Sequence, residues 1–196
     1  MAEQTALVRT RRRGKKLEDA LYDATLAEVA AVGYGALTME GIAARARTGK
    51  AALYRRWSSK HDLVHATLQY ALPPAPQPRP DRSARDNLLA MLAAHCDVVA
   101  GKTAFPGLGT INQLLHEPEL RAIFADTVVG PRLGIIESIL QAGATNGEID
   151  ATTLTPYTAR VGTALINQQV LLTGSPPTKR QLAHIVDTVI AKSTCG

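Results

Sequence analysis

Four side chains that can bind phosphates or base edges lie close together in the sequence: Lys50, Tyr54, Arg55 and Arg56. Lysine and arginine neutralise phosphate charge, arginine pairs with guanine in the major groove, and a tyrosine hydroxyl donates to phosphate oxygens. Leu53 and Trp57 lie four residues apart in the same stretch and would give a helix one buried face. The four polar side chains then stay exposed, and this pattern favours nucleic-acid binding.

Short helices must hold these side chains against a bundle. Thr38 is a typical N-cap for the first of them, and the segment 47–49 is expected to form a tight turn before the next helix. Two short helices joined by such a turn, inside a basic bundle, describe a helix-turn-helix. The expected helices of this part run over 15–32, 39–43, 50–57 and from Ser59 to about Leu72.

Charge is distributed unevenly along the chain of 196 residues. The formal net charge is +5, and the whole excess lies within residues 1–62, because residues 63–196 are neutral. Such asymmetry favours a phosphate-bearing partner, either nucleic acid or an anionic membrane surface, although a solvated tail kept for solubility explains it too. The basic run Arg9–Lys16 could follow the DNA backbone or enter the minor groove, or it could be a mobile tail. We expect no membrane partner, because the bundle already uses the apolar residues near this run.

A proline-rich segment divides the chain. Five prolines in eight positions, Pro73 to Pro80, cannot form a helix interior or a central strand. We therefore expect a basic tail with a DNA-binding domain over 1–62, a connecting helix and linker over 63–82, and a helical regulatory domain over 83–196. Strand signals are nearly absent, so the predicted fold is all-α. The later helices are expected over 84–100, 110–115, 119–129, 131–144, 153–172 and 178–192.

Several other classes of protein are disfavoured. The sequence shows no signal peptide or membrane-spanning run, so the expected location is the cytoplasm. Cys96 and Cys195 form no zinc-ligand pattern, and the pair His61 and His65 lacks a third ligand. Nucleophile elbows, phosphate-binding loops and dinucleotide fingerprints are missing, so we expect no enzyme, cofactor or metal.

The stretch from Thr38 to Leu63 resembles the DNA-binding domain of the tetracycline-repressor (TetR/AcrR) family. That family shows an Ile-Ala helix, a turn, a short helix Lys-Gly-Thr-Leu-Tyr-Arg-His-Phe and then Ser-Lys-x-Asp-Leu. Here the last two parts read Lys-Ala-Ala-Leu-Tyr-Arg-Arg-Trp, over 50–57, and Ser-Lys-His-Asp-Leu, over 59–63. The family turn Gly-Val-Ser is replaced by Arg47-Thr48-Gly49, which places a left-handed residue on Arg47 or shifts the turn, and leaves Thr48 as the substitute cap.

The resemblance implies roles for individual residues. Phosphate contacts are implied for Thr38, Tyr54 and Lys60, and base-edge contacts for Lys50 and Ala51 at the start of the recognition helix. Arg47, Thr48 and Arg55 are further candidates for DNA contact, and Arg56 adds charge where the family has histidine. Trp57 is expected in the core.

The resemblance also implies a C-terminal domain that dimerises and binds a small-molecule inducer of unknown identity. The expected dimer residues, which could instead close the core of one protomer, are Val161, Leu165, Leu172, Leu182, Ile185, Val186 and Val189. The expected ligand-pocket residues, each of which could be plain core or surface, are Met91, His95, Phe105, Leu108, Ile111, Asn112, Leu115, Phe124 and Asn167. The implied function is a homodimeric, ligand-released repressor on a palindromic operator; the alternative is a constitutive or architectural DNA-binding protein without an inducer.

Overall fold

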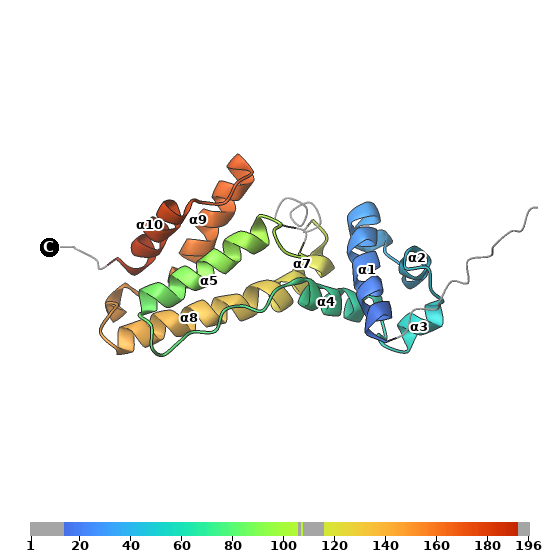
Figure 1. Cartoon of the computed structure of the whole chain (residues 1–196), viewed down its shortest axis with the longest axis horizontal. Coiled ribbons are helices and arrows are strands. Elements are labelled where there is room, and N and C mark those ends of the chain that lie inside the picture. Colours follow the sequence, from blue (N-terminus) through green and yellow to red (C-terminus); the bar gives the residue numbers. More distant parts are fainter. Residues whose placement is uncertain (1–13, 106, 108–115, 192–196) are drawn as a thin grey trace, which may run out of the picture.

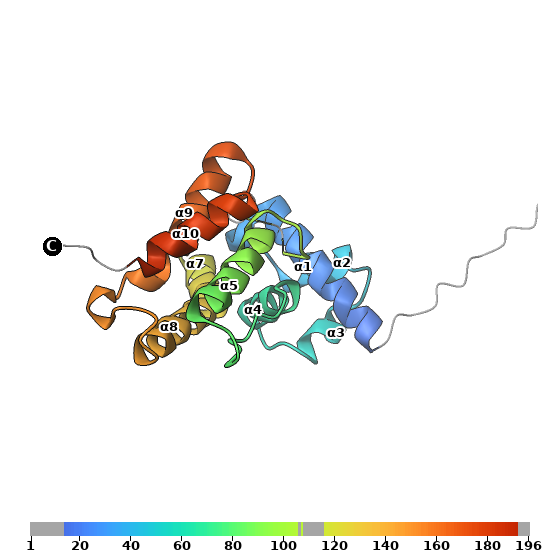
Figure 2. The same ribbon diagram turned by 60° about the vertical axis from the view of Figure 1, so that its left-hand side comes forward.

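The computed structural model describes residues 14–105, 107 and 116–191, and this part of the chain is all-helical, as predicted (Figure 1). Helices α1–α3 lie at one end of the molecule and α5, α8, α9 and α10 at the other, with α4 between them (Figures 1 and 2). The elements are α1 Lys15–Ala36, α2 Met39–Arg45, α3 Lys50–Tyr54, α4 Lys60–Ala71, α5 Ala84–Val99, α7 Pro118–Phe124, the π-helix η1 Ala125–Val129, α8 Gly130–Thr145, the 3-10 turn η2 Ala151–Thr153, α9 Thr158–Thr173 and α10 Lys179–Ile190. Among these described helices, none is both long and apolar enough to cross a bilayer.

The predicted caps of the N-terminal helices are confirmed. The hydroxyl of Thr38 accepts from the amide of Gly41, and that of Ser59 accepts from the amide of Asp62. The helix expected to stop at Gly33 instead bends there, with φ at 77°, and continues for one more turn. A positive φ suits glycine because it has no Cβ, so the glycine marks a kink rather than an end.

Two hydrophobic cores hold the molecule together, and the first crosses the linker. It unites α1–α4 with residues from beyond the linker, including Val98, Phe105, Leu120 and Val128. The second lies among α5, α8, α9 and α10. Helix α4 therefore packs on α1 and also on α7 and η1. The N-terminal helices and the C-terminal helices thus share packed side chains and are not merely tethered.

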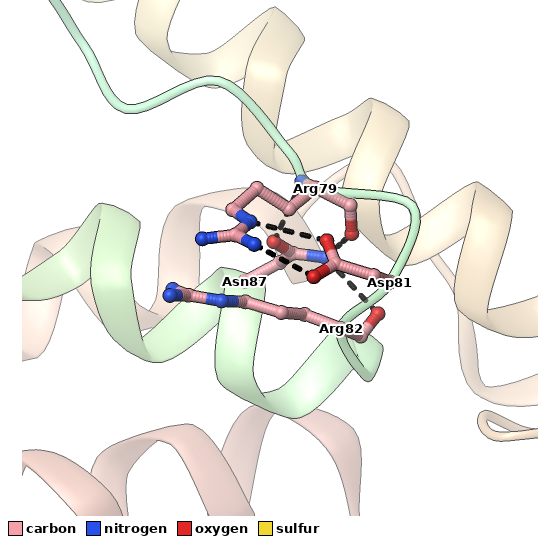
Figure 3. A network of polar contacts seen from close by, with 4 residues as sticks. All are labelled: Arg79, Asp81, Arg82 and Asn87. Atoms are coloured by element: carbon pink, nitrogen blue, oxygen red, sulfur yellow. Dashed lines mark hydrogen bonds and ion pairs between the residues drawn. The ribbon is translucent and has the colours of Figure 1, made fainter.

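The proline-rich linker is fixed against α5 by one amide side chain (Figure 3). Asn87 accepts from the backbone amide of Arg79 at 2.9 Å and donates to its carbonyl at 2.9 Å. It also donates to the carbonyl of Arg82, and Arg79 forms a two-pronged ion pair with Asp81. The side chain of Asn87 thereby binds the turn Arg79–Arg82, in which the amide of Arg82 donates to the carbonyl of Arg79.

Some predicted boundaries were wrong. The recognition helix ends at Tyr54 rather than Trp57, and α9 begins at Thr158 rather than Thr153, after a short 3-10 turn. The helices expected to be separate over 119–129 and 131–144 form one continuous run through η1. Pro131 lacks an amide and its ring crowds the carbonyl four residues earlier, so a wider π-turn just before it avoids the conflict. The helix expected over 110–115 lies outside the described residues.

Candidate DNA-binding surface and ligand cavity

The turn of the helix-turn-helix carries a strained arginine. Arg47 has φ 55°, so of the two outcomes expected from the missing glycine, the left-handed position is the one observed. Its amide donates to the carbonyl of Ala44, and the amide of Thr48 donates to that of Ala43. This bond pair is a Schellman motif with Arg47 at the C′ position, where glycine is preferred. The same motif ends α5 and α8, with Gly101 and Gly147 at C′.

Thr48 does not take over the capping role expected of it. The N-cap of α3 is Gly49, and no side chain bonds to the first amides of the helix. Those amides are left for solvent or for a ligand, because the first turn of a helix has no internal acceptors. Thr38 is exposed, and its hydroxyl can still donate a hydrogen bond while its oxygen caps α2.

The recognition helix α3 separates a buried face from an exposed polar face. Ala52, Leu53 and Trp57 are buried, so the prediction that Trp57 lies in the core is confirmed. Tyr54 is half exposed, and Arg56 donates to the carbonyl of Ala52. The other predicted contact residues on this face are exposed as well: Arg47, Lys50, Ala51 and Arg55. Lys50 alone among them has an acidic partner within the described residues, Glu40 at 3.7 Å.

Lys60 has structural partners that the sequence pattern did not predict. Its ammonium donates to the carbonyls of Tyr34 at 3.0 Å and Gly35 at 3.3 Å, and lies 4.6 Å from the centre of the Tyr34 ring. It thus caps the C-terminus of α1, where a cation is favourable. An ammonium carries three donors, so one remains for the phosphate contact implied by the family resemblance.

An exposed apolar strip runs along α9. Val161, Leu165, Leu171 and Leu172 are between 36% and 78% exposed. Between this helix and α10 lies an open groove of about 1110 Å³, whose lining includes Leu165, Leu172 and Ile185. Of the other residues expected at a dimer interface, Leu182, Val186 and Val189 belong to the second core of the protomer and are not available to a partner.

A cavity of about 100 Å³ lies where the two cores meet. Four residues expected to line a pocket do so: His95, Phe105, Phe124 and Asn167. Met91 does not, because it is buried in the second core, and Leu108, Ile111, Asn112 and Leu115 lie outside the described residues. The remaining lining residues were not predicted: Val98, Val99, Val128, Val129, Arg132, Leu133 and Thr163.

The polar end of the cavity contains one neutral pair and one cation. The Nε2 atom of His95 lies 2.8 Å from Oδ1 of Asn167. Burial, and to a lesser degree the charge of Arg132, lowers the pKa of His95, while the bond to Asn167 opposes this. The histidine is therefore neutral at pH 7. Arg132 is partly buried and donates to the carbonyl of Pro73 at 2.8 Å.

Other groups with possible reactivity include the thiol of Cys96 and the hydroxyl of Thr127. Burial raises the pKa of the Cys96 thiol to about 11, so this thiol is protonated at neutral pH. Thr127, in η1, is buried, and within the described residues its hydroxyl has no hydrogen-bond partner. The described residues contain no group of three or more acidic, cysteine or histidine side chains suited to a metal ion.

Comparison with protein families matches both halves of the chain. Residues 21–67 match the model "Bacterial regulatory proteins, tetR family", and residues 78–189 match "Tetracyclin repressor-like, C-terminal domain". The chain belongs to the TetR family. It is a DNA-binding transcriptional regulator, as the resemblance over residues 38–63 implied.

Similar proteins agree with this assignment. The uncharacterized HTH-type transcriptional regulator Rv1556 of Mycobacterium tuberculosis is 29% identical over 161 residues, which cover 82% of this chain and 79% of the relative. The flavonoid-responsive regulator FrrA superimposes with a TM-score of 0.64 at 15% identity, covering 90% of this chain and 94% of the other. FadR from Bacillus subtilis, solved in complex with stearoyl-CoA, gives a TM-score of 0.63 at 16% identity, covering 88% and 97%. These two structures support the fold.

Within the TetR family fold, Arg132 is the charged residue among the cavity-lining residues that sequence reasoning missed. It follows Pro131 in an apolar stretch, where a single arginine is normally taken for a surface charge. The contact with Pro73 joins residues far apart in the sequence, and no local pattern signals it.

Proposed function

We propose that this TetR-family chain is a ligand-released repressor that binds a palindromic operator as a homodimer. The observation that carries the proposal is the position of the cavity between the two hydrophobic cores. Val98, Phe105 and Val128 in its wall also belong to the core that contains α1–α4. A ligand in the cavity therefore touches side chains that are packed with the DNA-binding end.

DNA contact is assigned to the exposed face of α3 and the turn before it. Lys50, Tyr54 and Arg55 would meet phosphates and base edges, and Arg47 would add a charge at the turn. Only the phosphate contacts make affinity depend on salt, whereas base contacts give specificity. Thr38 and Lys60 would fix the orientation from the starts of α2 and α4.

Dimerisation is assigned to α9 and the groove beside it. An exposed strip of Val161, Leu165 and Leu172 is larger than the scattered apolar residues of an ordinary surface. A two-fold dimer through this strip would present two copies of α3, which must lie about 34–36 Å apart to enter successive major grooves. The two-fold axis would match a palindromic operator.

Release follows from a shift between two spacings of the recognition helices. A ligand that binds the dimer more tightly in one of these two conformations shifts the population toward that conformation. The shift can be no larger than the difference in the ligand's affinity for the two conformations. Because α4 packs on α1 and also on α7 and η1, a change at the cavity wall reaches α1 through direct contacts.

The assignment of the DNA face is tested with Lys50→Met and Tyr54→Phe, titrated against labelled DNA from the region flanking the gene. Lys179→Met, an exposed lysine at the start of α10, is the matched control. Both variants should bind about tenfold more weakly than the wild type, the usual effect of losing one good contact, and the control should bind equally well. Wild-type affinity in both variants would place DNA contact elsewhere.

A further inference from the structure

The cavity has a charge imbalance that restricts what it can bind. Most of its wall is apolar, and its polar end holds Arg132 beside the neutral pair of His95 and Asn167. Among the described residues, no carboxylate lies within ion-pair distance of Arg132. Burial lowers the pKa of its guanidinium, although the group stays charged at neutral pH. The cavity therefore carries one positive charge that the protein around it does not balance.

The guanidinium has donors to spare. One of its five N–H bonds is used by the carbonyl of Pro73. A carboxylate matches the remaining fork in two parallel hydrogen bonds, which are stronger than bonds between neutral groups. His95 and Asn167 hydrogen-bond to one another and offer no competing charge.

The volume limits the rest of the ligand. An engineered apolar cavity of about 150 Å³ holds benzene, and the cavity here is about 100 Å³. In proportion, a body of about four carbons fits this space, whereas an aromatic ring or a long acyl chain needs the cavity to open.

We propose that the ligand of this cavity is a small apolar carboxylate whose anionic group binds Arg132; this rests on the proposed function in taking the cavity as the regulatory site. The apolar body faces the valine and phenylalanine side chains of the wall. A neutral analogue of the same shape leaves the positive charge unbalanced and binds more weakly.

The same arginine links the cavity to the DNA-binding end. Pro73 directly follows Leu72, the C-cap of α4, so the bond from Arg132 ties α8 to the end of α4. The stronger bonds to a carboxylate on the free fork draw the guanidinium into the cavity, so the carboxylate competes with the Pro73 carbonyl for the position of the group. Ligand binding thus weakens a tether on the helix that packs against α1. This competition is the regulatory step of the proposal.

The test compares acids with their amides. Butanoate, 3-methylbutanoate and the two corresponding neutral amides are titrated into the full-length protein by calorimetry, with the wild type, Arg132→Met, Arg132→Lys and the control Arg121→Met. Arg121 is exposed on α7, in the same continuous helical run. We expect at least one acid to bind the wild type and Arg121→Met at least about tenfold more tightly than its amide. Arg132→Met should lose this preference and Arg132→Lys should keep part of it.

Equal affinity of acids and amides, unchanged acid binding in Arg132→Met, or no acid binding up to millimolar concentration would each overturn the proposal. Operator affinity is measured on the same samples. Operator binding that persists while no acid binds refutes the ligand class and leaves the DNA-binding function intact. Acid binding without operator release supports the ligand class and refutes release by competition at Pro73.

Discussion

Replacing Arg47 by glycine separates the cost of its backbone conformation from the value of its charge. Arg47 has φ 55° at the end of α2, and the equivalent positions in α5 and α8 are Gly101 at 68° and Gly147 at 74°. All three positions make the same pair of backbone hydrogen bonds. The sequence therefore keeps arginine at the one of these three turns that faces the proposed DNA surface.

The expected stability change follows from two opposing terms. A residue with a Cβ in the left-handed region costs about 1–2 kcal/mol. Glycine avoids that cost but loses about 0.5–1 kcal/mol more in backbone entropy on folding. Arg47→Gly should therefore raise the free energy of unfolding by about 0.5–1 kcal/mol. If Arg47 neutralises one phosphate, the same change should reduce the slope of log affinity against log salt by about 0.9.

Urea denaturation gives the stability, and fluorescence anisotropy with labelled DNA over a salt series gives the slope. Arg47→Ala removes the charge and keeps the strain, while Arg47→Lys keeps both. Gly and Ala variants should share the reduced slope, and only Gly should gain stability. A Gly variant no more stable than Ala would refute the strain argument, and wild-type slopes in both would refute the phosphate contact.

Three further predictions concern other parts of the molecule. Lys60→Met should lower the free energy of unfolding by about 1–2 kcal/mol, because the carbonyls of Tyr34 and Gly35 lose a charged donor; urea denaturation showing no loss relative to Lys179→Met would contradict the capping role. The lowered pKa of His95 means that the unfolded chain binds a proton first, so stability should fall as the pH drops below about 6.5. Thermal melts between pH 7.5 and 5.5 should show a smaller fall in His95→Gln, and equal falls would refute the assignment. Leu172→Glu should convert a dimer to a monomer in light scattering after size exclusion, whereas an unchanged mass would place the interface elsewhere.

The helical fold and the DNA-binding end were predictable because their signals are local. Caps such as Thr38 and Ser59 act within one turn, and the missing turn glycine correctly located the left-handed backbone at Arg47. Apolar spacing also placed Trp57 in the core. Each of these features depends on residues within a few positions of one another.

The features that local patterns missed depend on distant contacts. Leu182 and Val186 have the same apolar pattern whether they face a partner or their own core, and only the packing of α10 on α5 and α9 decides. The π-turn before Pro131 arises because the proline ring crowds the carbonyl four residues earlier, while packing keeps the helix continuous. The tether from Arg132 to Pro73 joins two segments separated by the whole of α5 and α7.

The central claim, that this regulator reads a specific operator, is tested most directly by anisotropy titration of the wild type. Labelled DNA from the region flanking its gene is compared with random DNA of equal length across a salt series. The account predicts saturable binding of one dimer per site, an affinity ratio of ~10³ or more over random DNA, and weakening with salt. Equal affinity for both DNAs at every salt concentration, for this and other DNA from the genome, would contradict it.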